Sequence, residues 1–135
     1  MARRLLLRNS VPDSISTAEA GKRGELLACE ELARLGYAIL ATRHRTRYGE
    51  IDIIARDNDV TVFVEVKARR SARRGAAAEQ ITFHKRRRIA AMALDYLAWT
   101  RSLDTRCRFD VVAIDRFEAA GQTIRVIKDA FQVDG

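Results

Sequence analysis

Three charged residues interrupt apolar segments near the middle of the chain. Asp52 stands between isoleucines in Glu50-Ile51-Asp52-Ile53-Ile54, while Glu65 and Lys67 lie within the valine-rich segment 60–69. A charge among apolar residues must be paired, protonated, metal-bound or at the edge of a pocket, because burying it alone costs several kcal/mol. Two carboxylates suit a divalent cation such as Mg2+. A lysine beside such an ion can position a water molecule and offset negative charge on a phosphoryl group.

The spacing of these residues predicts that they meet. A turn at residues 57–59 makes segment 50–56 an antiparallel partner of strand 60–69. Pairing residues 54 and 55 with residues 62 and 63 would place Asp52 opposite or diagonal to Glu65. Alternation along the strand gives it two faces: Val62, Val64 and Val66 on one, and Phe63, Glu65 and Lys67 on the other. The alternative is an ordinary ion pair between Glu65 and Lys67 on an exposed face. Phe63 lies on the same face, and an aromatic residue there argues against exposure.

A third carboxylate is expected on a helix. Segment 18–35 follows a candidate cap at Thr17 and ends at Gly36. At 100° per residue, Glu25 falls near the middle of the expected apolar stripe, so we favour a site role over an accidental position at the rim. The expected stripe contains Leu26, Ala28, Cys29, Leu32, Ala33 and Leu35.

The remaining pattern predicts an α/β fold: a mixed five-stranded sheet flanked by helices in three layers. Strands are expected at 37–42, 108–115 and 123–128, loops at 43–49 and 70–79, and a helix at 80–101. Its residues Ile89, Met92, Ala93, Tyr96 and Leu97 are expected in the core. The 135 residues are too few for two cores, so we expect a mobile N-terminal arm at 1–17 and a single domain at 18–135.

These motifs resemble those of a known superfamily. Glu25, Asp52 and the Glu65-Val66-Lys67 triplet resemble the PD-(D/E)XK nucleases, although Ile51 stands where the formal motif has proline. Over about residues 18–131, GELLACEELARLGYAIL, YGEIDIIARD, VFVEVKAR, Lys85, Arg88 and RFDVV resemble the YraN-like family of predicted bacterial endonucleases. His44 stands where that family commonly has asparagine. The central elements are also similar to archaeal Holliday-junction resolvases.

The resemblance implies a restriction-endonuclease-like fold and specific roles. Asp52 and Glu65 would ligate Mg2+, for which Mn2+ could substitute, and the Val66 carbonyl could complete the ligands supplied by the protein. Glu25 would act on a second metal ion or through water. Lys67 would position the nucleophilic water. A resolvase-like activity would also require a homodimer.

The positive charge is concentrated in one segment. The chain has 25 basic and 18 acidic residues, a net charge of +7, and residues 69–88 alone hold eight basic residues and one acidic residue. Arginine suits phosphate recognition. Six residues are expected to bind nucleic acid: Arg69, Arg70, Arg73, Arg74, Lys85 and Arg88. Because Tyr48, Phe83 and Trp99 are the only aromatic residues expected to be exposed, duplex or branched DNA is favoured over base-specific single-strand recognition, and RNA is possible.

Other features narrow the class of protein. No apolar run is long enough to span a membrane or serve as a secretion signal, so we expect a cytoplasmic protein. Cys29 and Cys107 are too far apart in sequence to suggest a zinc motif. His44 and His84 are expected to be surface or packing residues.

The leading hypothesis is a Mg2+-dependent endonuclease acting on DNA, with branched or junction DNA in repair or recombination as a candidate substrate. The alternative is a non-catalytic nucleic-acid-binding module that acts with a partner protein. An RNA-directed nuclease is a third interpretation.

Overall fold

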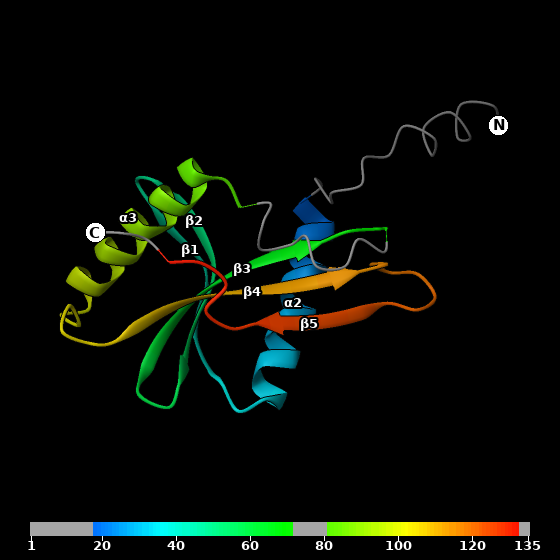
Figure 1. Ribbon diagram of the computed structural model, residues 1–135, viewed down its shortest axis with the longest axis horizontal. Coiled ribbons are helices and arrows are strands. Elements are labelled where there is room, and N and C mark those ends of the chain that lie inside the picture. Colours follow the sequence, from blue (N-terminus) through cyan, green and yellow to red (C-terminus); the bar gives the residue numbers. More distant parts are fainter. Residues whose placement is uncertain (1–17, 72–80, 133–135) are drawn as a thin grey trace.

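The computed structural model describes residues 18–71 and 81–132, which form an α/β fold as predicted (Figure 1). The expected arm at 1–17 lies outside the described residues, as do Arg73 and Arg74. The elements in chain order are α2 (Ala18–Arg34), β1 (Ala38–Thr46), β2 (Gly49–Asp57), β3 (Val60–Ala68), α3 (Phe83–Trp99), β4 (Cys107–Asp115) and β5 (Thr123–Ile127).

The five strands form one mixed sheet in the order β1-β2-β3-β4-β5. Only β3 and β4 are parallel, whereas the other neighbouring pairs are antiparallel. A parallel pair needs a long crossover, and the segment containing α3 provides it. The connection carries the end of β3 back to the start of β4, so α3 crosses the face of the sheet on which Glu65 and Lys67 of β3 lie.

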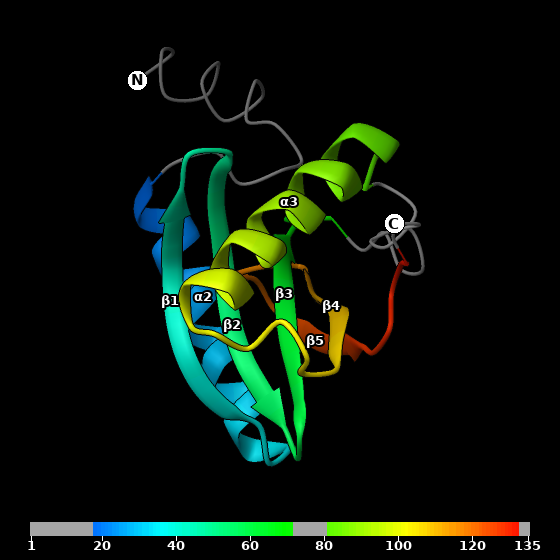
Figure 2. The ribbon, with the colours of Figure 1, turned by 90° about the vertical axis from the view of Figure 1, so that its left-hand side faces the viewer.

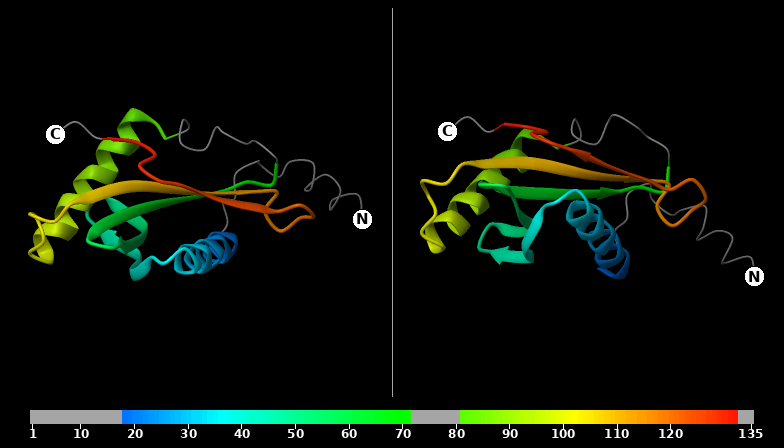
Figure 3. Two further views of the ribbon diagram at one scale, coloured as in Figure 1. Left: turned by 60° about the horizontal axis from the view of Figure 1, so that its bottom comes forward. Right: turned by 90° about the horizontal axis from the view of Figure 1, so that it is seen from below.

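Helices α2 and α3 cover opposite faces of the sheet. Figure 2 shows α3 in front of β1, β2 and β3, with α2 behind them, and Figure 3 shows α2 along one face of the sheet. Each face has its own apolar cluster. Phe63 packs with Ile89 and Met92 on the α3 side, whereas Val62 and Val64 pack with the α2 side. The fold therefore has the three layers that the sequence predicted.

The predicted apolar stripe of α2 was wrong in part. Its buried residues are Ala20, Gly24, Ala28 and Leu32, spaced by four. Leu26 is 64% exposed, and Ala33 and Leu35 are exposed as well. Small residues form most of this narrow contact, because the helix lies close to the sheet: a Cβ atom at Gly24 would be 3.6 Å from Ala68 Cβ. The 100° periodicity had favoured the larger leucines instead.

Most other element boundaries agree with the sequence prediction to within a few residues. Helix α2 ends just before Gly36, which has a φ of 97°, and the Tyr37 N–H donates to the Leu32 carbonyl oxygen there. The largest difference is β1, which continues to Thr46 through part of the expected loop at 43–49. Its extension places His44 against Tyr96 and Trp99, the packing role predicted for His44. The expected core stripe of α3 is also confirmed, with Tyr96 only partly buried.

Candidate active site

The candidate site lies where β2 and β3 separate. The predicted pairing is confirmed, since Ile54 faces Phe63 and Ala55 faces Val62. Regular pairing ends one step further on, at Ile53 and Val64. Asp52 would face Glu65 in the next position of this register, but there its carboxylate replaces the backbone as hydrogen-bond acceptor.

Asp52 is held at this gap by the backbone of β3. The Val66 N–H donates to Asp52 Oδ2 at 2.8 Å. The side-chain alternation of β2 is also broken at this point, because Ile51 packs on the α3 side although Ile53, two residues later, packs on the α2 side. A local irregularity in β2 therefore directs a carboxylate toward β3 rather than into the core.

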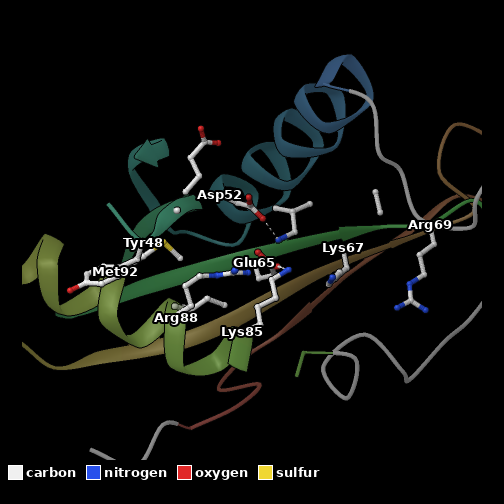
Figure 4. A pocket seen from close by; sticks show the side chains of 13 residues that line it. Tyr48, Asp52, Glu65, Lys67, Arg69, Lys85, Arg88 and Met92 are labelled. Atoms are coloured by element: carbon white, nitrogen blue, oxygen red, sulfur yellow. Dashed lines mark hydrogen bonds and ion pairs between the residues drawn. The ribbon is translucent and has the colours of Figure 1, made fainter. Parts of the chain in front are cut away.

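A pocket of about 410 Å³ opens between this gap and α3. The sheet contributes Asp52, Glu65 and Lys67, and α3 contributes Lys85 and Arg88 (Figure 4). Gly49, Glu50, Val66, Ala68 and Ile89 also line it, with Tyr48, Met92 and Arg69. The predicted face of β3 is thus confirmed, and the crossover helix closes the site from the other side.

The carboxylates of the site are recessed and close to each other. Burial, together with the negative charge of Glu65, raises the pKa of Asp52 to about 8, although the Val66 N–H opposes the shift. The Glu65 side chain is only 13% exposed and forms an ion pair with Lys85 Nζ. Without a bound cation, a proton on Asp52 and the Lys85 ammonium compensate the charge of the two carboxylates.

The two lysines have different electrostatic environments. Burial lowers the pKa of Lys67, and the positive charge of Lys85 lowers it further. Burial also opposes the charged form of Lys85, but attraction to Glu65 prevails and raises the pKa of Lys85. Lys67 is therefore the lysine of the pair that releases its proton more readily.

The donor set fits a hard divalent cation in part. Asp52 and Glu65 converge, and burial is the main cause of the raised pKa of Asp52, but the negative charge of Glu65 contributes to it, and a cation would remove that repulsion. Within residues 18–71 and 81–132, however, no three His, Cys, Asp or Glu side chains form a group that could hold a metal ion. A cation here would need further oxygen ligands from the backbone, water or substrate.

Glu25 approaches Asp52 from the opposite side of the sheet. It lines a smaller pocket of about 140 Å³ together with Asp52 and Val66, and it does not line the larger one. Glu25 Oε1 lies 3.2 Å from Arg43 Nε. Burial raises the pKa of Glu25, which Arg43 partly offsets and Glu50 reinforces. The structure therefore brings Glu25 to the edge of the site, with Arg43 as its immediate partner.

The residues expected to bind nucleic acid occupy different positions. Arg69 is 4% exposed and lines the main pocket. Arg70 is exposed, and its charge acts on Glu118 on the surface. Arg88 lines the pocket as well, but Lys85 lies deeper than expected, against Glu65. Of the Arg69–Arg74 segment, Arg69 is therefore on the same side of the sheet as the carboxylates.

A second charged cluster was missed by sequence reasoning. Asp110 is fully buried and accepts hydrogen bonds from the Tyr37 hydroxyl at 2.8 Å and Arg108 Nε at 2.8 Å. Arg108 Nη2 also donates to Asp57 Oδ2 at 3.0 Å. The signal was present in the sequence, since Arg108 and Asp110 are oppositely charged and two residues apart on one strand, so their side chains share a face. The cluster lies toward the β2–β3 hairpin, away from the pocket, and its polar groups are paired with one another.

Fold and site together define a three-layer α/β domain with a recessed carboxylate and lysine pocket beside its crossover helix. Residues 24–114 match the model of a family described as uncharacterised protein family UPF0102, and the chain belongs to this family, the YraN-like family that the motifs predicted. A UPF0102 protein of Syntrophus aciditrophicus is 46% identical over 113 residues, covering 84% of this chain and 88% of the relative.

Similar values come from other bacteria. A UPF0102 protein of Symbiobacterium thermophilum is 46% identical over 111 residues, which cover 82% of this chain and 94% of the relative. One from Lachnoclostridium phytofermentans is 46% identical over 116 residues, covering 85% and 94% respectively. Among the described residues, neither helix is long and apolar enough to span a membrane.

Proposed function

We propose that this protein is a metal-dependent DNA endonuclease of the PD-(D/E)XK type. The observation that carries the proposal is the convergence of Asp52 and Glu65 at the β2–β3 gap, in one pocket with Lys67. This is the arrangement that the resemblance to the superfamily implies. The three-layer fold, with the triplet of residues 65–67 on a central strand, agrees with it.

Each residue has a role that follows from its position. Asp52 and Glu65 would hold Mg2+ or Mn2+, with the Val66 carbonyl as a further ligand. The bound ion would activate water and stabilise charge on the phosphate. Lys67, whose pKa is lowered, would orient the attacking water and exchange a proton with it. Arg69 and Arg88, which line the same pocket, would bind phosphate oxygens, and Glu25 would act from the smaller pocket through water.

Cleavage assays test this proposal directly. Linear, flapped and four-way DNA should be incubated with Mg2+ or Mn2+ and with the wild type, Asp52→Asn and Glu65→Gln. We expect cleavage of at least one substrate, and a loss of roughly 100-fold or more in each variant, because removal of a ligand weakens the ion that activates the water. The matched control is Asp95→Asn, an exposed carboxylate on α3. Activity retained in both site variants would overturn the catalytic assignment.

Two observations favour a second function, that of a nucleic-acid-binding module without catalysis. Lys85 already neutralises Glu65 from within the chain, and the described part of the chain offers no three-ligand metal group. In that case DNA binding in EDTA would depend on salt and on Arg88. Asp52→Asn would not weaken it, and neither Mg2+ nor Mn2+ would produce cleavage of any substrate.

A further inference from the structure

The main pocket, called the trough below, has chemically different ends. Figure 4 shows Tyr48 and Met92 at one end, the carboxylates and Lys85 in the middle, and Lys67 followed by Arg69 at the other end. The carboxylates are recessed between the sheet and α3, with Glu65 13% exposed. Asp52 and Glu65 both line the trough, so a phosphate that enters it reaches both carboxylates. The trough volume of about 410 Å³ is in the range of pockets that enclose a small ligand, which suits a nucleotide better than the width of a double helix.

The aromatic end is presented by a well-fixed turn. Tyr48 lies in the β1–β2 hairpin and is 41% exposed. The backbone N–H of Tyr48 donates to Thr46 Oγ1 at 3.1 Å. The Thr46 hydroxyl in turn donates to the Gly49 carbonyl oxygen at 3.0 Å. The guanidinium carbon of Arg47 lies 4.9 Å from the centre of the Tyr48 ring. An exposed ring on a hydrogen-bonded turn, with an adjacent cation, is suited to stacking against an unpaired base.

The opposite end has an unsatisfied donor. Arg69 is 4% exposed, and its Nη1 atom is buried without a hydrogen-bond partner among the described residues. Its backbone is fixed at both polar atoms, because the Arg69 N–H donates to the Ile114 carbonyl oxygen and the Arg69 carbonyl oxygen accepts from the Phe117 N–H, each at 2.8 Å. A buried guanidinium donor without a partner is costly, and a phosphate oxygen would satisfy it with a charge-assisted hydrogen bond.

We propose that this trough binds one DNA strand, with an unpaired base against Tyr48, a phosphate at Arg69 and the phosphodiester between them above Asp52 and Glu65. The substrate class is DNA with unpaired nucleotides at the point of cleavage, such as a flap or an opened branch. This inference rests on the proposed function for the cleavage step but not for binding of the strand. It needs one stacking residue and no base-specific hydrogen bonds.

Binding is measured without divalent ions, so that neither cleavage nor a metal ion contributes. Fluorescence anisotropy in EDTA compares a duplex carrying an unpaired flap with a fully paired duplex of the same number of phosphates. We expect the flap to bind about tenfold tighter or more to the wild type. Tyr48→Ala should weaken flap binding by about tenfold with little change for the duplex, since stacking is lost, whereas Tyr48→Phe should retain it. Trp99→Ala is the control, because Trp99 is an exposed aromatic residue outside the pocket lining.

Two further readouts separate stacking from general charge. A 2-aminopurine in the flap should be quenched by the wild type and less by Tyr48→Ala. Arg69→Met should reduce the salt dependence of flap binding by about one single-strand phosphate, a slope change of ~0.7, whereas Tyr48→Ala should leave that slope unchanged. Arg69→Lys keeps the positive charge and serves as the conservative variant. Thermal melting of each variant shows whether a loss of binding comes from the lost phosphate contact or from a loss of folding.

Failure of the strand assignment and failure of the nuclease proposal give different results. Equal affinity for flap and duplex, or equal losses in Tyr48→Ala and Trp99→Ala, would overturn the strand assignment even if the protein cuts DNA. Tyr48-dependent flap binding without cleavage in Mg2+ or Mn2+ would uphold the strand assignment and overturn the nuclease proposal.

Discussion

The position of Asp52 at the β2–β3 gap, where its carboxylate is buried, raises its pKa. Its pKa in the folded chain is about 8, against an ordinary value of 3.8, with burial as the main cause. The folded state therefore holds this proton more tightly than the unfolded state. The resulting stabilisation is complete below about pH 4 and is lost as the pH rises through about 8. Without a cation, the site weakens the fold at the pH at which an ionised carboxylate would be needed.

This proton leads to a prediction for Asp52→Asn. The amide oxygen can still accept the Val66 N–H, but no charge has to be buried at high pH. In EDTA, the variant should melt close to the wild type at pH 4 and higher than the wild type at pH 8.5, by on the order of 5 °C. Thermal melting across this range checks it, with Asp95→Asn as the control. A difference that stays constant with pH would contradict the assigned pKa of Asp52.

Lys85 competes with a cation for Glu65. Because the Lys85 ammonium pairs with that carboxylate, a divalent ion must displace it or share its partner. Lys85→Met should therefore lower stability in EDTA, yet bind Mn2+ more tightly, by roughly three- to tenfold on the basis of a partly screened charge pair. Titration calorimetry and the Mn2+-induced shift in melting temperature measure the change.

The control for Lys85 is Arg87→Met, which removes an exposed positive charge from the same turn of α3 without altering the pocket lining. Both variants lower the net charge equally. If they tighten Mn2+ binding to the same extent, the effect comes from overall charge, and the specific competition at Glu65 is wrong.

Helix α2 approaches the sheet through a line of small residues. At Gly24 a Cβ atom would make an ordinary contact with Ala68 Cβ at 3.6 Å, and at Gly21 it would meet nothing within 4 Å. Gly24→Ala and Gly21→Ala should each stabilise the protein by about 0.5–1 kcal/mol, because alanine favours the helix. Gly24→Leu should destabilise it by about 1–3 kcal/mol, since the larger side chain forces the helix away from β3, whereas Gly21→Leu should not.

Denaturation by urea, with the midpoint and slope compared across these four variants, checks the α2 prediction. Similar stability of Gly24→Leu and Gly21→Leu would show that the helix can move without cost. Because Gly21 and Gly24 also line the smaller pocket beside Glu25 and Asp52, Mn2+ binding should be followed in the same variants.

The strands could be predicted from sequence more completely than the helix contact. Alternating valines and the turn at Asn58 determine the β2–β3 register, and that register brings Asp52 beside Glu65. The contact face of α2 could not be read correctly, because periodicity weights large apolar residues whereas the sheet selects small ones. The pairing of Lys85 with Glu65 depends on where the crossover places α3, and no local pattern specifies that distance.

At the scale of the whole molecule, the charged groups at the two ends of the central strands have different environments. Toward the β2–β3 hairpin, charged residues are paired with one another around Asp110. Toward the other end, the same strands leave Asp52 protonated and Arg69 Nη1 without a partner among the described residues. The paired cluster stabilises the fold, whereas the groups at the other end lie in the pocket where the proposed ligands would bind.

The Asp110 cluster should therefore carry much of the stability without contributing to the pocket. Asp110→Ala leaves Arg108 and the Tyr37 hydroxyl without their buried partner and should cost about 3–5 kcal/mol. Tyr37→Phe removes one hydroxyl and should cost about 1 kcal/mol. Arg45→Met is the control, because its ion pair with Glu50 is exposed and worth at most about 1 kcal/mol. Guanidinium denaturation should show the loss of stability decreasing in the order Asp110→Ala, Tyr37→Phe, Arg45→Met.

The Mn2+ affinity of Tyr37→Phe should equal that of the wild type. A weaker Mn2+ affinity in this variant would mean that the two ends of the strands are coupled.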